Sequence, residues 1–502
     1  MSLQAEAAAA LPGRAARRLF GTDGVRGSFG EPPLDRSTVT ALARELAAML
    51  VSGLPVEGAG GKPLVVLGGD TRASSPEICG WLALGLAAGG AAVRHAGVIP
   101  TPGVAFLARE LGAAAGIAVS ASHNPYPDNG IKLLDSGGYK WSADREAELE
   151  RRLFAALEGA AGGEGGNGVA DRSGGAGGSS GTRDSGGAPG LRELYLRHLA
   201  ASLPAGRDGD LPGVPAMIDV PAALPLAGMR VVADAGNGAA SGYAGELFGR
   251  LGADCTVLAA QPDGRNINQG CGSTVPEKVA AAVLRLGADL GAAFDGDADR
   301  CVLADERGEV RDGDAILYLW ALDLERQGKL EPARIVATSM SNLGLERALA
   351  REGIGVVRCG VGDREVVETM RREGILLGGE QSGHIVQLDL EATGDGLLTA
   401  LQMTYLVRRA GRPLSELLAG FRRYPQILVN VRVARKPDFA ALPRLAAAAR
   451  AVEDELGTDG RLVLRYSGTE PLARVMIEGP EQDAIEVMAR QLAAILAEEL
   501  GG

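Results

Sequence analysis

The stretch "AAGIAVSASHNP" (114–125) shows the pattern that decides the fold. Its small and apolar residues fit a buried strand, and a polar loop with Ser122 and His123 follows directly. Five further stretches have the same form: "PLVVLGGDTR" (63–72), "MRVVADAGNG" (229–238), "ADLGAAFDGDADR" (288–300), "ARIVATSMSN" (333–342) and "GILLGGEQSGH" (374–384). Helix patterns such as "RSTVTALARELAAML" (36–50) and "PEKVAAAVLRLGA" (276–288) lie between them. This alternation predicts parallel α/β sheets, in which ligands bind beyond the carboxyl ends of the strands.

Length and composition limit the possible classes of protein. A chain of 502 residues with 46% hydrophobic residues predicts about three or four globular domains. A net charge of −12 argues against nucleic acid as the main partner. The five cysteines form no C-x-x-C pair, which argues against a disulfide framework or a structural zinc site and fits a reducing cytoplasm. No run approaches the ~18 apolar residues of a membrane span, so we expect a cytoplasmic protein without membrane contact.

Several stretches differ from this alternation. The alanine-rich N-terminus is read as a tail rather than a signal peptide, because its arginines follow the apolar part. The Gly/Ser-rich segment 159–190 and the loose stretch 204–225 hold few large apolar residues, so we expect both to loop into solvent. The extended patterns "ILVNVRVAR" (427–435) and "RLVLRYSGTEPLARVMIEG" (461–479) surround a helix, which favours a small C-terminal α+β domain with an antiparallel sheet.

"DGDADR" (295–300) is the clearest metal-binding motif. Asp295, Asp297 and Asp299 alternate, so an extended turn can direct all three carboxylates to one point, and such oxygen ligands suit Mg²⁺ or Ca²⁺. An EF-hand loop is a rival interpretation because Glu306 falls at position 12, but Arg300 stands where the sharp turn requires glycine. A polar turn without a metal is the third interpretation.

Three other motifs are weak signals when each is taken alone. "RYSGTEPLAR" (465–474) offers the hydroxyl, backbone and guanidinium donors of a phosphate cradle, although polar hairpin turns have a similar composition: Arg465, Ser467, Gly468 and Thr469. "FGTDGVRG" (20–27) places Arg26 in a glycine-rich turn. "GGEQSGH" (378–384) presents three groups that can exchange hydrogen bonds with sugar hydroxyls or can serve the fold alone: Glu380, Ser382 and His384.

Ser122 stands directly before His123, which raises the question of a hydrolase. A hydrolase elbow reads G-x-S-x-G, and the histidine of a catalytic triad comes from elsewhere in the chain. Neighbouring side chains in an extended loop point opposite ways, so we expect His123 to be a poor base for Ser122. A hard-metal motif together with a phosphate cradle favours phosphoryl transfer, with Ser122 carrying the phosphate.

Taken together and in this order, "GTDGVRG", "SASHNPYPDNGIK", "DGDADR", "GGEQSGH" and "RYSGTEPLARVMIEG" resemble the motifs of the α-D-phosphohexomutase superfamily. The resemblance runs from about Leu19 to the end, apart from the low-complexity insert. "NINQGCG" (266–272), "VGDREVVETM" (361–370) and Gln381 look like the bacterial phosphoglucosamine mutases within that superfamily. The phosphomannomutase/phosphoglucomutase branch usually carries methionine at the Gln381 position.

The resemblance implies an α/β protein with three mixed α/β domains of related topology and a C-terminal α+β domain, arranged around a central cleft. The expected division is domain 1 with the phosphoserine loop (19–158), a linker or insert (159–190), domain 2 with the metal loop (191–309), domain 3 with the sugar-binding loop (310–424) and domain 4 with the phosphate-binding loop (425–502). Gly69 departs from the superfamily, whose members commonly have lysine there, but Asp70 and Arg72 remain.

The resemblance also implies roles for single residues. One Mg²⁺ is expected between the phosphoserine oxygen and three carboxylates: Ser122, Asp295, Asp297 and Asp299. Catalysis is expected from one nucleophile and four further residues: Ser122, Arg26, Lys132, Arg300 and His384. Lys132 and His384 look like the acid/base pair, and their order in the two half-reactions stays open. Substrate binding is expected from two loops: Glu380, Ser382 and His384, and Arg465, Ser467, Gly468 and Thr469.

The implied reaction interconverts glucosamine 6-phosphate and glucosamine 1-phosphate through a phosphoserine enzyme and a glucosamine 1,6-bisphosphate intermediate, and supplies UDP-N-acetylglucosamine for cell-wall synthesis. Glucose or glucosamine 1,6-bisphosphate is the expected activator, with an activating kinase or autophosphorylation as further sources of the phosphate. A monomer or a homodimer is expected. Two alternatives remain: a mutase that prefers glucose or mannose phosphates, and a non-catalytic sugar-phosphate binding protein.

Overall fold

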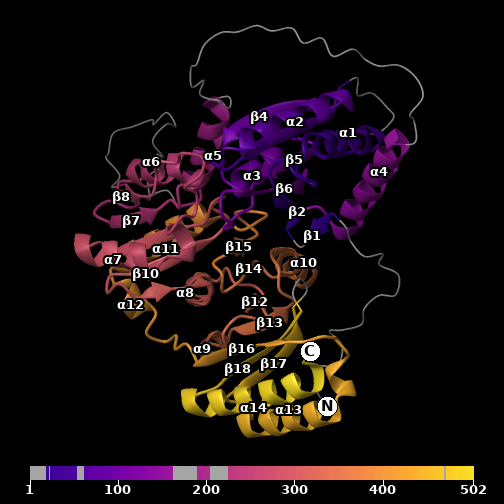
Figure 1. Cartoon of the computed structure of the whole chain (residues 1–502). Coiled ribbons are helices and arrows are strands. Elements are labelled where there is room, and N and C mark those ends of the chain that lie inside the picture. The colour runs from indigo at the N-terminus through magenta and orange to yellow at the C-terminus, as the bar shows by residue number, and fades with distance from the viewer. Residues whose placement is uncertain are drawn as a thin grey trace.

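The computed structural model describes residues 19–21, 23–53, 61–161, 189–203, 224–467 and 471–501. The predicted N-terminal tail and most of the two low-complexity stretches lie outside these residues. The described chain forms four sheets, and we call each sheet with its helices a unit (Figure 1). Among the described helices, none combines the length and the apolar character that a membrane crossing requires.

The first unit contains a sheet of six strands, which are given in spatial order: β1 (Phe20–Gly21), β2 (Gly24–Ser28), β6 (Asp128–Asp135), β5 (Ala115–Val119), β3 (Leu64–Gly69) and β4 (Ala92–Val98). Four helices accompany it: α1 (Arg36–Ser52), α2 (Ser75–Ala88), α3 (Thr101–Glu110) and α4 (Ala143–Ala161). Helix α1 begins after Asp35, whose side chain accepts the N–H groups of Ser37 and Thr38. Its buried side chains pack against α2 and complete one core under the sheet.

The second and third units are built in the same manner. The second sheet has five strands: β11 (Val310–Arg311), β10 (Cys301–Asp305), β9 (Leu290–Phe294), β7 (Arg230–Asp234) and β8 (Asp254–Leu258). Its helices are α5 (Pro189–Ala201), α6 (Ala244–Arg250) and α7 (Glu277–Leu286). The third sheet has four strands: β13 (Gly355–Cys359), β12 (Arg334–Thr338), β14 (Leu377–Gly379) and β15 (Ile385–Gln387). Its helices are α8 (Gly313–Arg326), α9 (Leu343–Arg351), α10 (Asp363–Glu373), α11 (Gly396–Ala410) and α12 (Leu414–Leu417).

The first three sheets share one strand order. Each contains a parallel trio followed by one antiparallel strand: β4-β3-β5-β6, β8-β7-β9-β10 and β13-β12-β14-β15. The predicted fold class, three mixed α/β domains of related topology, is therefore confirmed, whereas the expectation of parallel sheets was incomplete, because each trio is followed by an antiparallel strand. The loops at 120–127, 295–300 and 380–384 are too short for a parallel crossover, which needs about a dozen residues, so the next strand returns antiparallel.

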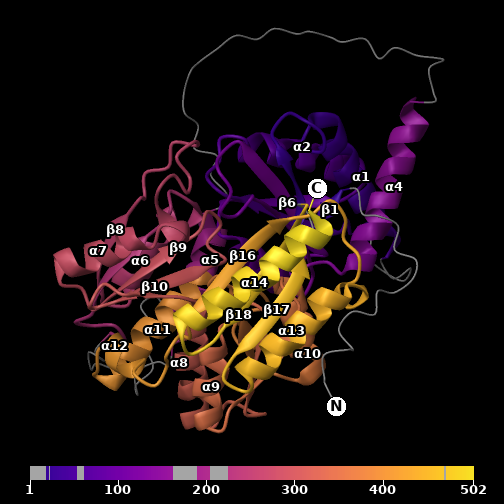
Figure 2. The same cartoon turned by 60° about the horizontal axis from the view of Figure 1, so that its bottom comes forward.

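The last unit is the predicted α+β domain. Its antiparallel sheet runs in the order β16 (Gln426–Arg432), β18 (Leu472–Glu478) and β17 (Arg461–Tyr466). Helices α13 (Pro443–Leu456) and α14 (Gln482–Leu500) cover one face of it, as Figure 2 shows. Its hydrophobic core is separate, while one continuous core includes residues of the first three units. The polar motifs of units one to three follow β5, β9 and β14, the equivalent strand of each trio.

Candidate active site

The backbone of Ser122 is held from two units. Ser122 has φ of +54°, a left-handed conformation that is strained for a residue with a side chain. Its carbonyl oxygen accepts hydrogen bonds from Arg72 Nη2 at 3.0 Å and Asn268 Nδ2 at 2.9 Å. Its N–H donates to Ser120 Oγ at 2.9 Å, and Ser120 donates to Asp70 at 2.7 Å. The strained serine is thus fixed in place rather than free to relax.

The hydroxyl of Ser122 faces the metal loop. Its Oγ donates to Asp295 Oδ2 at 2.5 Å and lies 3.4 Å from His123 Nδ1. The expectation that His123 points away from Ser122 is therefore wrong, because the positive φ takes this loop out of the extended form. Burial, with Arg300 and Arg26 nearby, lowers the pKa of His123 and keeps its ring neutral near pH 7.

Asp295, Asp297 and Asp299 meet as the sequence spacing predicts. All three side chains are buried, and one ligand atom from each lies within 4.8 Å of the others. Gly296 allows this loop to approach the serine loop, since a Cβ here would lie 2.6 Å from the backbone oxygen of Ser122. Strands β9 and β10 flank the loop, which excludes the EF-hand interpretation.

These carboxylates fit a hard divalent cation. The Oδ1 atoms of Asp297 and Asp299 are buried and have no hydrogen-bond partner among the described residues. Burial, together with Asp299 and Asp297, raises the pKa of Asp295 well above its ordinary value. Three neighbouring carboxylates repel one another when all are ionised, and Mg²⁺ with oxygen ligands offsets that repulsion. The donor set therefore suits Mg²⁺ better than a turn without a metal.

Lys132 supplies part of the positive charge beside this triad. Its Nζ donates to Asp297 at 2.8 Å and Asp299 at 3.0 Å, and lies 3.4 Å from Asp23. Burial alone would lower the pKa of Lys132, but these carboxylates raise it well above its ordinary value. Burial would likewise raise the pKa of Asp299, but Lys132 and His384 hold it well below its usual range.

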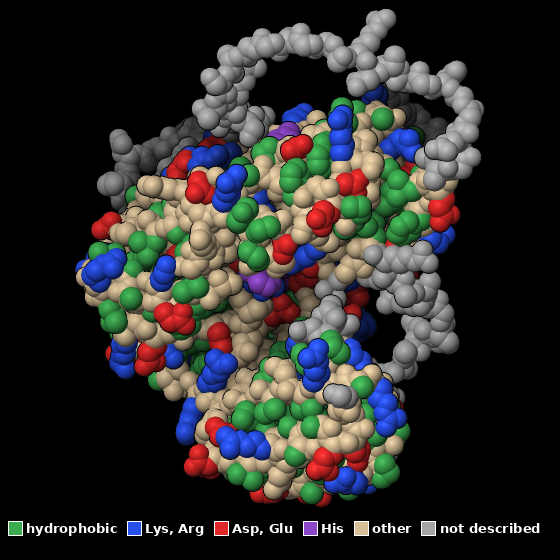
Figure 3. Space-filling view, in the orientation of Figure 1, with side chains coloured by type: hydrophobic (Ala, Val, Ile, Leu, Met, Phe, Trp, Pro, Cys, Tyr) green, Lys and Arg blue, Asp and Glu red, His purple; other side chains and the backbone are tan. Residues whose placement is uncertain are grey.

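A cavity of about 660 Å³ opens beside the serine and metal loops, within the size range of small-molecule sites. Figure 3 shows a hollow in the middle of this face, above the C-terminal unit, where acidic and basic side chains gather. The charged and ionisable residues of the cavity wall come from the first three units: Asp23, Arg26, His123, Asp299, Arg300, Asp363, Glu380 and His384. This mixture of charges of both signs suits a polar ligand that exchanges several hydrogen bonds.

His384 lies in this wall with one ring nitrogen already engaged. The N–H of Gly394 donates to His384 Nε2 at 3.1 Å, so a neutral ring carries its hydrogen on Nδ1. That Nδ1 lies 3.9 Å from Oδ1 of Asp299. Burial would lower the pKa of His384, but Asp299, Asp363 and Glu380 raise it.

Glu380 and Ser382 form a small hydrogen-bonded group at the cavity edge. Glu380 accepts from the N–H of Gly362 at 3.1 Å and from the hydroxyl of Ser382 at 3.2 Å. Gln381 differs from them, because its Nε2 donates to Asp314 Oδ2 at 3.1 Å. Gln381 is not part of the cavity wall, so its influence on a ligand is indirect.

The proposed phosphate cradle is only partly described. Arg465 stands near the end of β17. Two residues later, the backbone oxygen of Ser467 accepts a hydrogen bond from Lys436 Nζ at 2.6 Å. Gly468 and Thr469 lie outside the described residues. Neither Arg465 nor Ser467 belongs to the described wall of the cavity, so the structure does not bring these two into the site.

Four site residues were missed by the sequence reasoning. Asp23 and Asp363 line the cavity, Lys140 contacts both carboxylates, and Asn268 holds the serine loop. Asn268 lies in "NINQGCG" and Asp363 in "VGDREVVETM", two motifs that the resemblance singled out without giving them a role. The contacts of Lys140 with Asp23 and Asp363, and of Asn268 with the serine loop, join distant parts of the chain, so no local sequence pattern indicated them.

Models of four domains of one family match this chain. They are described as Phosphoglucomutase/phosphomannomutase, alpha/beta/alpha domain I (residues 17–159), domain II (213–308) and domain III (312–424), and the C-terminal domain (428–495). A phosphoglucosamine mutase of Thermobifida fusca is 45% identical, over 96% of this chain and 99% of that relative.

Two solved structures share the fold. A phosphoglucomutase/phosphomannomutase family protein from Burkholderia thailandensis matches with a TM-score of 0.70 at 24% identity, over 95% of this chain and 97% of that one. An Aspergillus fumigatus N-acetylphosphoglucosamine mutase in complex with GlcNAc-6P and magnesium matches with a TM-score of 0.58 at 17% identity, over 96% of both chains. The strand order, the buried aspartate triad and the full-length identity agree: the chain belongs to the phosphoglucomutase/phosphomannomutase family, in the group of the phosphoglucosamine mutases.

Proposed function

We propose that this enzyme interconverts glucosamine 6-phosphate and glucosamine 1-phosphate through a phosphoserine at Ser122 and a glucosamine 1,6-bisphosphate intermediate. The observation that carries the proposal is the 2.5 Å contact of Ser122 Oγ with Asp295 in a buried carboxylate triad. The bacterial relative at 45% identity supplies the choice of sugar through its name, phosphoglucosamine mutase. The reaction is proposed as a cytoplasmic step, in line with five free cysteines.

The first half-reaction transfers the phosphoryl group from the enzyme to the sugar. The C1 hydroxyl of glucosamine 6-phosphate attacks phosphorus, the bond from phosphorus to Ser122 Oγ breaks, and the hydroxyl proton leaves to a base while Oγ takes up a proton. Arg26 and Arg300 stand in the cavity wall, where their charges stabilise the transferring group. Lys132 and His384 are the candidates for the proton transfers, since both lie at the triad.

The second half-reaction reverses these bonds at the other end of the sugar. After the bisphosphate has turned, Ser122 Oγ attacks the 6-phosphate, the bond from phosphorus to O6 breaks, and O6 takes the proton that Oγ gives up. Protons therefore balance over the cycle. Glu380 and Ser382 contact the sugar hydroxyls in both orientations, and the donors of the C-terminal loop hold the phosphate that is not reacting: Arg465, Ser467, Gly468 and Thr469.

The proposal includes one Mg²⁺ held by Asp295, Asp297 and Asp299, which supplies neutralisation of the phosphate charge as a Lewis acid. It also includes glucose or glucosamine 1,6-bisphosphate as the source of the Ser122 phosphate. The fungal relative has been crystallised with a sugar phosphate and magnesium, which supports this pairing by analogy. The same proposal includes the division of the chain into domains 19–158, 191–309, 310–424 and 425–502, with 159–190 as a linker or insert.

The test compares kcat/KM for the phosphates of glucosamine, glucose and mannose, with Mg²⁺ and a bisphosphate activator. A preference of about 100-fold or more for glucosamine phosphate is expected, because a site that pairs the amino group rejects the hydroxyl analogue. Ser122→Ala should lose about 10⁴-fold or more and should show no phosphate by intact-mass analysis; phosphate on that variant would point to Ser120. Equal turnover of glucose or mannose phosphate contradicts the substrate assignment, and binding without turnover contradicts the enzymatic one.

A further inference from the structure

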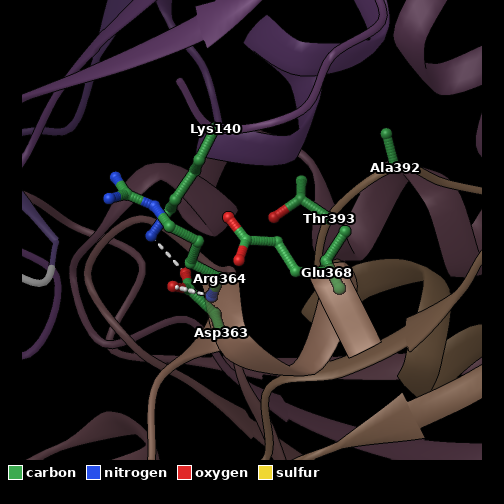
Figure 4. A pocket seen from close by; sticks show the side chains of 7 residues that line it. Lys140, Asp363, Arg364, Glu368, Ala392 and Thr393 are labelled. Atoms are coloured by element: carbon green, nitrogen blue, oxygen red, sulfur yellow. Dashed lines mark hydrogen bonds and ion pairs between the residues drawn. The ribbon is translucent and has the colours of Figure 1, made fainter. Parts of the chain in front are cut away.

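Lys140 joins two carboxylates that come from different units. It follows β6 in the first unit, and its Nζ contacts Asp23 in the turn between β1 and β2. The same Nζ contacts Asp363, the first residue of α10 in the third unit. Figure 4 shows the Lys140 side chain reaching down to the Asp363 carboxylate. Burial would lower the pKa of Lys140, but Asp23 and Asp363 raise it, so this lysine is a permanent cation.

The two carboxylates line the cavity, whereas Lys140 does not. Lys140 instead reaches them from behind, beside a small second cavity of about 20 Å³ that has room for one water molecule. Asp23 and Asp363 are partly buried, and two such carboxylates repel each other when no cation lies between them. Burial would raise the pKa of Asp363, but Lys140 lowers it, which keeps both carboxylates ionised at close range.

Each of these carboxylates also touches a residue of the reaction. Asp23 forms an ion pair with Arg26 and lies 3.4 Å from Lys132 Nζ. Asp363 Oδ2 lies 4.0 Å from His384 Nε2. The contacts of Lys140 therefore connect the serine side of the cavity, which belongs to the first unit, with the sugar side, which belongs to the third.

A second pair of contacts shows that this is a built interface between the two units. Arg364, the next residue of α10, forms a 2.6 Å ion pair with Glu146 of α4. Arg371 stacks over the ring of Tyr139 at 4.4 Å. Residues 139–146 thus dock on one side of α10. Neither Arg364 nor Glu146 lines the main cavity, which makes their ion pair a natural control for Lys140.

We propose that Lys140 is a positioning residue: without touching the substrate, it holds Asp23 and Asp363 together and so sets the separation between the serine side and the sugar side of the cavity. The inference rests on the proposed function, because a positioning role needs a reaction between those two sides. A displacement of about 1 Å of reacting groups costs about 100-fold in rate.

The experiment measures kcat and KM of the full-length enzyme with Mg²⁺ and glucose 1,6-bisphosphate, on whichever hexose phosphate the wild type isomerises fastest. Lys140→Met is expected to lower kcat/KM by about 100-fold. Arg364→Met removes the neighbouring ion pair between the same two units and is expected to stay within about threefold of wild type. The double variant Lys140→Met, Asp363→Asn removes the repulsion and is expected to be about tenfold more active than Lys140→Met alone.

Three results would overturn the proposal. Lys140→Met could stay within threefold of wild type, both methionine variants could lose activity in proportion to their loss of unfolding free energy, or the double variant could be no more active than Lys140→Met alone. If Lys140→Met does not fold, Lys140→Arg keeps the cation and must retain at least about a tenth of wild-type kcat/KM. If the wild type isomerises no hexose phosphate, the proposed function fails independently of this inference. The Kd for glucose 1,6-bisphosphate is then the readout. Lys140→Met must raise this Kd tenfold, whereas Arg364→Met must leave it unchanged.

Discussion

Ser122 and Arg465 both stand beside a hairpin loop between two antiparallel strands, but their surroundings differ. The loop of Ser122 lies where three units that share one hydrophobic core meet, and Asn268 and Asp295 of the second unit hold it. Arg465 belongs to a unit with a core of its own. The first region is held from several sides, whereas the second is carried by a single small domain.

The C-terminal unit is joined to the third unit at the far end of its hairpin. The side chain of Asn342 bonds to both the N–H and the oxygen of Tyr424 and donates to Glu478 at 3.1 Å. Arg461 donates to the backbone oxygen of Ser341 at 2.8 Å. From this joint, the strands run about 20 Å to their loop, so a rotation of about 10° moves the loop by about 4 Å. Under the proposed function, the chemical steps take place in this fixed frame, and the proposed phosphate-binding loop lies on a unit that is joined at one end, which we call the lever. We expect the lever to turn toward either end of the substrate.

Removing one carboxylate of the fixed frame should have the largest effect. Asp297→Asn should lower kcat/KM by about 10³-fold or more, because the metal site loses a charged ligand. It should also abolish the rise in melting temperature that Mg²⁺ gives the wild type. Steady-state kinetics and thermal melts with and without Mg²⁺ check both parts. Asp254→Asn, an exposed change on β8, is the control, and an unchanged Mg²⁺ response in Asp297→Asn would contradict this metal site.

The joint itself gives the next prediction. Asn342→Ala removes the side chain that bonds to Tyr424 and Glu478, and leaves the N–H groups of Gly344 and Tyr424 without their acceptor. A loss of roughly 3 kcal/mol in the free energy of unfolding is expected. Hydrogen exchange should quicken in β17 and β18 while β5 and β9 keep their protection. Equal changes in all four strands would show that the two regions do not respond separately.

Many strands of the fixed frame could be predicted from the sequence, whereas most of the contacts between its side chains could not. The six quoted stretches are six of the nine parallel strands of the first three sheets, because an apolar run that ends in a polar turn is a local signal. The other three, β4, β8 and β13, were not predicted. The antiparallel strand after each motif was missed, although the loop length already required it. His123 was misplaced because nothing in "SASHNP" announces the positive φ of Ser122.

Contacts between units had no such local signal. Lys140 and Asp363 lie 223 positions apart, and Asn342 and Glu478 lie 136 apart. Each pair depends on how two finished units pack, which a hydrophobic period does not encode. The roles given to Arg465, Ser467, Gly468 and Thr469 came from resemblance, and they stay predictions until the lever is tested.

The lever is tested most directly at Arg465. Arg465→Ala should raise KM about 50-fold and change kcat by no more than a few fold, because it removes a charge-assisted bond to the phosphate that is not reacting. Arg432→Ala on the other edge strand of the same sheet is the matched control and should leave both parameters alone. A fall in kcat with KM unchanged would contradict this prediction, because it would mean that Arg465 acts on the chemical step, like the residues of the fixed frame.

The smallest predicted effect is a pH dependence of the joint. Asp314 is buried beneath Asn342, and its Oδ2 accepts from the backbone N–H of Asn342 at 2.8 Å and from Gln381. Burial and the neighbouring Asp312 raise the pKa of Asp314 to about 7. An unfolded aspartate titrates near 4, so the folded state holds this proton more tightly. The resulting stabilisation is complete below about pH 4 and is lost as pH rises through 7.

Asp314→Asn should therefore change sign in its effect with pH. Above pH 8 the ionised wild-type residue costs about 4 kcal/mol, from about three pKa units, and asparagine avoids this cost. Its amide oxygen can accept both hydrogen bonds, but its NH₂ group takes the place of the buried Oδ1, which has no hydrogen-bond partner among the described residues, and a buried donor without an acceptor costs about 2 kcal/mol at every pH. Urea unfolding should then find the variant more stable by on the order of 2 kcal/mol at pH 8.5 and less stable at pH 4.5. If the free energies of unfolding of wild type and variant instead change in parallel across this pH range, Asp314 is already ionised at neutral pH. The stability of the joint would then not depend on the protonation of Asp314.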